Sequence, residues 1–160
     1  MVRTELIQSL DNNIRILADF ARSVPADRLH ITRRDGCWSI YQHVHHLSEV
    51  QKVIHLRLGQ FLAEGPQTIV PINPDKATDS LVDESTPLEG LLENFATWRG
   101  KQLDIIRSAP DATWTREIHH PEYEKYSFAI MVRHALLHDA FHMHRIEELW
   151  LLHDEYLPDL

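Results

Sequence analysis

Histidines recur near the carboxyl end of the chain, at His134, His138, His142 and His144. Residues four apart in a helix lie on one face, so His138 and His142 point the same way and His134 lies one turn earlier. Counting about 100° per residue puts His138 and His142 on the apolar side of such a helix and His144 well off it. Two imidazoles that face a core need either hydrogen-bond partners or a metal ion, and the spacing by itself allows both.

A second group of histidines lies earlier in the chain, where His46 is at the margin of an apolar helical arc and His43 is three residues before it on a nearby face. Either could supply a third ligand, and His134 could add a fourth or simply form a hydrogen bond. Three neutral imidazoles that leave a coordination position open make a catalytic type of site. A metal there polarises a bound group or lowers the pKa of a bound water or thiol.

Four stretches show the three- to four-residue spacing of apolar residues that is typical of amphipathic helices. The predicted helices cover residues 4–23, 40–63, 88–108 and 127–153. Ser39 and Gln42 have the spacing of a capping box at the start of the second helix. The segment of about residues 66–87 is long for a loop, and it fits a crossover that runs the length of a bundle. The predicted fold class is therefore all-α, a four-helix bundle, while residues 111–127 allow two short strands or an irregular loop.

Composition narrows the class of protein. The chain has 160 residues, 43% of them hydrophobic, which predicts one globular domain over residues 1–160. A formal net charge of −8 without a clustered basic stretch argues against a nucleic-acid partner. The single cysteine, Cys37, cannot form an internal disulfide, and no apolar run is long enough for a signal peptide or a membrane span. We therefore expect a cytoplasmic protein without a membrane partner, and the 12 histidines point to a metal.

Two motifs resemble those of the DinB/YfiT-like family. Trp38-Ser39-Ile40-Tyr41-Gln42 with His46-Leu47 resembles the signature of its second helix, in which a His-Leu pair follows a Trp-Ser pair by eight residues. His138-Asp139-Ala140-Phe141-His142, closing with Ile146, resembles the His-x-x-x-His signature of its last helix. The resemblance spans nearly the whole chain, because the helix order and the long connection before the third helix also match. The chain departs at Gln42, where the family often has Glu, and at His144-Arg145, where it often has Gly-Gln.

The resemblance implies an up-down-down-up bundle with the long crossover between helices two and three. It implies that His46, His138 and His142 bind a divalent metal ion, usually zinc or nickel, and that the protein is a homodimer. Family members include thiol S-transferases that use low-molecular-weight thiols, and many others are called metal-dependent hydrolases. The implied function is a metal-dependent transferase, of the thiol S-transferase type, that acts on a small molecule. The alternatives are a metal-dependent hydrolase, a metal- or small-molecule-binding module without turnover, and a purely structural bundle.

Several other residues near these motifs have two interpretations each. Glu49 and Asp139 could accept a hydrogen bond from a metal-bound imidazole or be ordinary charges on exposed helix faces. Trp38 could pack under the site, although a core anchor at the start of the second helix is the simpler interpretation. His119 and His120 could line the mouth of a pocket, but we expect them to lie in an exposed loop.

Overall fold

The computed structural model describes residues 2–71 and 84–157. Its long helices are α1 (Arg3–Ser23), α2 (Ile40–Gln60), α4 (Leu88–Ser108) and α6 (Phe128–Leu151), with a short α5 (Asp111–Thr115). Single 3₁₀ turns cover Ala26–Arg28 and Asp154–Tyr156. The predicted all-α bundle is therefore confirmed. None of the helices in the described ranges combines the length and the apolar character that crossing a bilayer requires.

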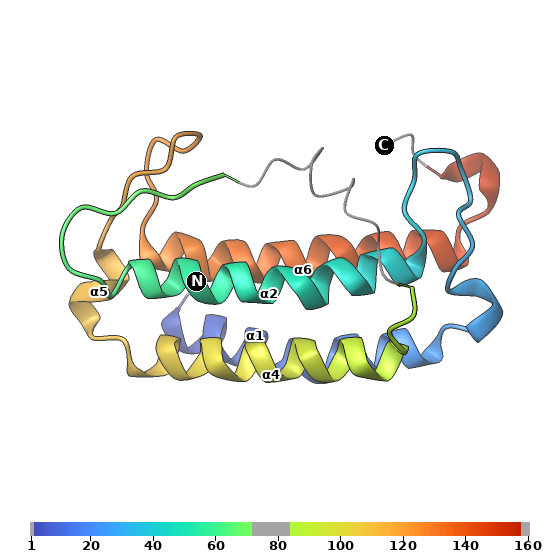
Figure 1. Ribbon diagram of the computed structural model, residues 1–160, viewed down its shortest axis with the longest axis horizontal. Coiled ribbons are helices and arrows are strands. Elements are labelled where there is room, and N and C mark those ends of the chain that lie inside the picture. The colour runs from blue at the N-terminus through green and yellow to red at the C-terminus, as the bar shows by residue number, and fades with distance from the viewer. Residues whose placement is uncertain (1, 72–83, 158–160) are drawn as a thin grey trace.

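The four long helices form two layers, with α2 and α6 side by side over α1 and α4 (Figure 1). Helices α1 and α6 run in one direction, and α2 and α4 run in the other, so the order is up-down-down-up as the resemblance implied. Because α2 and α4 are parallel neighbours, the chain must return along the bundle between them. Most of that predicted crossover, residues 72–83, lies outside the described residues.

The helix ends follow from local hydrogen bonds. The capping box predicted at Ser39 is present: its hydroxyl accepts from the Gln42 N–H, and the Gln42 side chain accepts from the Ser39 N–H. Helix α2 ends at Gln60, three residues before the predicted end, and the Arg116 guanidinium donates to the carbonyl of Phe61 just beyond it. Helix α6 ends at Leu151, and the Arg33 guanidinium donates to the carbonyls of Glu148, Leu149 and Leu152 around this end.

Residues 111–127 form neither of the two predicted arrangements completely. The segment begins with α5 and then continues as a loop that is fixed by two isolated bridges, Glu117 to Ser127 and Thr68 to His119. The second bridge joins the loop to the chain just after α2, with the Ile69 N–H donating to the His119 carbonyl over 2.8 Å. This long-range pairing holds the loop above the amino-terminal end of α6 (Figure 1).

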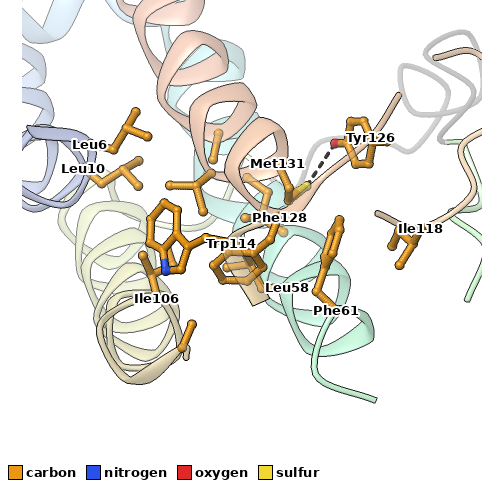
Figure 2. Packing of buried hydrophobic residues seen from close by; sticks show 14 of the residues in the cluster. Leu6, Leu10, Leu58, Phe61, Ile106, Trp114, Ile118, Tyr126, Phe128 and Met131 are labelled. Carbon is orange, nitrogen blue, oxygen red and sulfur yellow. Dashed lines mark hydrogen bonds between the residues drawn. The ribbon is translucent and has the colours of Figure 1, made fainter. Parts of the chain in front are cut away.

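The apolar core consists of two clusters. One gathers residues from the amino-terminal half of α1, the carboxyl-terminal halves of α2 and α4, and the start of α6, and Trp114 and Phe128 lie at its centre (Figure 2). The other occupies the opposite end of the bundle, around Leu47, Phe95 and Ile146. Burial of this apolar surface is the main favourable contribution to folding.

A layer of buried polar side chains lies between the two apolar clusters, and each of the four long helices contributes to it. Arg99 binds Asp139 at 2.8 Å, and both side chains are almost completely buried. The Asn13 amide donates to the same carboxylate, while Gln51 accepts from Arg99 and from Gln102. We call these five residues the polar layer. Along every helix they fall between residues of one cluster and residues of the other.

Candidate metal centre

Three imidazoles converge between α2 and α6. His46 comes from α2, and His138 and His142 come from successive turns of α6, which runs antiparallel beside it (Figure 1). One ring nitrogen from each lies within 4.8 Å of the others, and the Nε2 atoms of His46 and His138 are 3.2 Å apart. The structure therefore brings together the three histidines that the motifs singled out, from segments about 90 residues apart.

The donor set fits a divalent transition-metal ion. Two imidazole nitrogens bound at 2.0–2.1 Å to one tetrahedral ion lie about 3.4 Å from each other, close to the separation found between His46 and His138. Three protein ligands leave at least one coordination position for a water or a substrate, which is the arrangement of catalytic sites. Imidazole suits zinc, nickel, copper and iron alike, so the ligands alone do not select the metal.

Burial keeps these imidazoles neutral, which is the form that coordinates a metal. Removal from water lowers the pKa of His46 and of His138 to about 4, and neighbouring imidazoles and the more distant Arg99 add to the effect. Burial also lowers the pKa of His142 to about 2, and the nearby rings of His138, His46 and His43 add to the shift. All three therefore offer a lone pair at neutral pH.

His43, the alternative third ligand, contacts the centre in a different way. Its ring is buried, and its Nδ1 atom lies 2.9 Å from Nδ1 of His142. That contact occupies one nitrogen of His142 and leaves Nε2 for an ion. His134, the possible fourth ligand, has its Nδ1 atom 3.2 Å from the Tyr126 hydroxyl. Neither residue is part of the group of three converging nitrogens.

A cavity of about 480 Å³ opens beside the three histidines. Trp38 stacks on His142 with its ring planes 13° apart, and it lines the cavity at this end. The middle of the cavity is apolar, with side chains from the facing sides of the two helices: Val50, Ile54, Met131 and Ala135. Such a volume and such a lining are typical of sites for small molecules.

The sequence model of the DinB superfamily matches residues 9–146. The chain belongs to the DinB superfamily. A relative from Oceanobacillus iheyensis, which carries the name "Putative metal-dependent hydrolase", is 22% identical over 149 residues, or 93% of this chain and 86% of the relative.

Two solved structures from Bacillus subtilis have the same fold. YfiT, described as a probable metal-dependent hydrolase with an unusual four-helix bundle topology, matches with a TM-score of 0.80 and 24% identity over 92% of this chain and 85% of its own. The DinB-like protein YjoA matches with a TM-score of 0.62 and 12% identity over 98% and 95%. At these sequence identities, the structural similarity shows that the chain has the DinB bundle fold, and no activity is inferred from it.

Three expectations change in this DinB chain. Trp38 is more than a core anchor, because its ring lies 5.1 Å from that of His46 and lines the cavity. His120 does not lie in the open: it is 6% exposed and lines the cavity, whereas His119 is exposed as expected. Asp139 is neither exposed nor a partner of an imidazole, because its carboxylate binds Arg99 and Asn13.

Two further assignments agree with the simpler interpretation of the sequence. Glu49 forms an exposed ion pair with Lys52 and also accepts from Asn94. His144 is exposed on α6, 3.5 Å from the carboxylate of Glu148. One sequence signal could have identified Trp38 as a residue of the cavity: it directly precedes Ser39, the N-cap of α2, and so lies at the start of the helix that carries His46.

Proposed function

We propose that this DinB protein binds a divalent metal ion through His46, His138 and His142 and uses it to transfer a thiol to a small electrophile. One observation carries the proposal: three neutral imidazoles from two helices converge at the end of an apolar cavity large enough for a small molecule. The names of the relatives support the metal, and the resemblance to thiol S-transferases supports the reaction.

The protein's own residues have distinct parts in this proposal. The three imidazoles hold the ion, and His43 fixes the ring of His142 through the contact between their Nδ1 atoms. Trp38 and the apolar walls surround the reacting groups with nonpolar surface, which strengthens the electrostatic interactions there. A bound zinc or nickel ion supplies a Lewis acid that lowers the pKa of a thiol or water, so that a nucleophile exists at neutral pH.

Hydrolysis is the second candidate, because the relatives are named for it. The same site would then activate water in place of a thiol. A module that binds the metal without turnover is the third. We also propose that the chain forms the homodimer that the resemblance implies, which analytical ultracentrifugation of the metal-loaded protein would test.

Metal content provides the first experiment. We expect one equivalent of zinc or nickel by elemental analysis of the native protein and of His144→Ala, and no stoichiometric metal in His142→Ala. Added metal should also raise the melting temperature of metal-free native protein, because an ion that binds only the folded state stabilises it. Full metal retention in His142→Ala would overturn the proposed ligand set.

Turnover provides the second experiment. Metal-loaded protein is incubated with a low-molecular-weight thiol and chlorodinitrobenzene, and separately with nitrophenyl acetate. Consumption of thiol that His142→Ala abolishes supports the transferase, and ester hydrolysis alone supports the hydrolase. If stoichiometrically loaded protein does neither, the chain is a binding module and the catalytic proposal is wrong.

A further inference from the structure

The end of the cavity farthest from the three histidines carries a positive charge. Arg57 lies on α2 three turns after His46 and lines the cavity. Within residues 2–71 and 84–157 no carboxylate forms an ion pair with it, and its Nη2 atom donates to the carbonyl of Val70 over 2.9 Å. A guanidinium has five N–H donors, so most of its hydrogen-bonding capacity is left for another group.

This charge contrasts with the rest of the chain. The protein has 24 acidic residues against 16 basic ones, yet Glu122 is the one acidic side chain among the described residues that line the cavity. With a divalent ion held by neutral imidazoles at one end and Arg57 at the other, the cavity is positive despite that carboxylate. An acidic protein that keeps a positive cavity attracts anionic ligands into it.

His120 supplies a fixed polar group beside Arg57. Its ring packs against those of Tyr123 and Tyr126, with centroids 4.7 and 4.6 Å away. Its Nδ1 atom accepts a hydrogen bond from the Glu122 N–H over 3.1 Å, so in the neutral ring the proton is on Nε2 and that nitrogen is a donor. Burial lowers the pKa of His120, and the positive charge of Arg57 lowers it further against the opposing effect of Glu122.

His134 also lines the cavity, on α6 between Met131 and His138. It lies one turn from His138 on α6, and the Tyr126 hydroxyl holds its Nδ1 atom. Burial lowers the pKa of His134, and the nearby Arg57 adds to that shift. Arg57, His120 and His134 line the same cavity, and the charge of the guanidinium acts on both imidazoles.

We propose that Arg57 and His120 form an anion-binding subsite, and that the substrate is an extended small molecule with a carboxylate or similar anionic group at the end remote from the reacting atom. The inference rests on the proposed function, in that the reacting end is the one at His46, His138 and His142. Arginine suits this role because its planar fork binds carboxylate and phosphate oxygens through two parallel hydrogen bonds.

The geometry of α2 sets the length of that molecule. Arg57 comes eleven positions after His46, which corresponds to about 16 Å along the helix axis. Because both side chains reach into the cavity, a ligand that contacts the ion and the guanidinium spans on the order of 10–15 Å. A short thiol such as mercaptoacetate cannot bridge them, whereas a chain of about eight carbons can.

A matched pair of thiols tests the subsite. Mercaptooctanoate and mercaptooctanol differ only in the charge at the far end, and the sulfur-to-cobalt absorption band of cobalt-loaded protein reports the binding of either one. We expect the carboxylate to bind about tenfold to hundredfold more tightly, as a charge-assisted pair implies. Arg57→Gln should abolish this preference without changing the affinity for mercaptooctanol, and Arg57→Lys should keep part of it.

Lys52→Gln is the matched control, because it removes an exposed cation from the same helix. Equal affinities for the two thiols in the native protein, or a preference that persists in Arg57→Gln, would overturn the subsite. Calorimetry with octanoate and octanol on metal-free protein separates this failure from a failure of the metal site. In one outcome, neither thiol changes the cobalt spectrum, but octanoate binds and Arg57→Gln removes that binding. The subsite then stands and the proposed reaction is wrong. If octanoate does not bind either, both proposals are wrong.

Discussion

The Nδ1 atom of His43 lies 2.9 Å from the Nδ1 atom of His142, and both rings are buried. One of the two nitrogens must carry the proton. For His142 to offer the lone pair of Nε2 to an ion, its proton must be on Nδ1, so His142 donates and His43 accepts. His43 thereby selects the tautomer of His142 that can coordinate.

Substituting His43→Ala removes that acceptor. We expect the affinity for zinc or nickel to fall tenfold to hundredfold, as is usual when the partner of a metal-bound histidine is lost. Competition with a chromogenic chelator measures the change. His144→Ala is the control, since that exposed residue lies on the same helix as His142 and should leave the affinity as it is. An unchanged affinity in His43→Ala would show that the contact does not orient the ligand.

The polar layer makes a second prediction, for stability. Arg99→Met leaves the carboxylate of Asp139 buried without its cation, and we expect the free energy of unfolding to fall by about 3–5 kcal/mol. Urea denaturation measures this value. The double variant Arg99→Met with Asp139→Leu should recover part of the loss, because it removes both charges.

The control for that experiment is Arg107→Met, which breaks an ion pair between the same helix and α1, with Asp11, at the surface. Exposed pairs contribute less than about 1 kcal/mol. If Arg99→Met and Arg107→Met lower the free energy of unfolding equally, the buried ion pair stabilises the bundle no more than the exposed pair does.

A third prediction concerns pH. Burial holds the pKa of His46 and of His138 at about 4, whereas both are near 6.5 in the unfolded chain. Between these values the unfolded state binds more protons, so the free energy of unfolding of the metal-free protein should fall as the pH is lowered from 6.5 towards 4. Each imidazole contributes a slope of up to about 1.4 kcal/mol per pH unit.

Denaturation of metal-free protein at pH 7, 6 and 5 provides the measurement. His138→Gln should show a shallower slope than the native chain over this range, because one imidazole no longer has to charge on unfolding. Parallel slopes for the two proteins would mean that His138 is not held neutral in the fold.

The fourth prediction uses Trp38 as a reporter. Because its ring stacks on His142 with centroids 5.9 Å apart, an open-shell ion such as nickel at the centre should quench its fluorescence in a stoichiometric titration. Zinc, which has a filled d shell, should cause little quenching. Trp38→Phe is expected to abolish the nickel effect and leave the emission of the other tryptophans. Quenching that persists in Trp38→Phe would place the ion elsewhere.

Sequence spacing was sufficient for the four long helices and for the pair His138 and His142, because both depend on local helical geometry. It could not choose between His43 and His46. Three residues on a helix differ by about 60° around the axis, and an apolar arc does not define the rotation of α2 that closely. The choice came from the family resemblance, and the structure brings His46 into the group of three while His43 contacts one member of it.

Two features depend on contacts between distant segments, so local patterns could not predict them. His120 reaches the cavity because the bridge between Thr68 and His119 fixes the path of its loop. Asp139 directly follows the candidate ligand His138 in sequence, but its position is rotated by about 100° around α6. It therefore faces the inside of the bundle, where it binds Arg99 of α4. A carboxylate next to a histidine in sequence is thus a poor guide to what that histidine binds.

The polar layer also affects how the helices can move. If α6 slid by one turn against its neighbours, about 5.4 Å, Asp139 would enter an apolar cluster and Arg99 would lose its counter-charge. The four long helices therefore resist sliding along the bundle axis, and His138 and His142 stay level with His46 whether or not an ion is present. The three imidazoles are preorganised, so that metal binding would require little additional ordering of the protein.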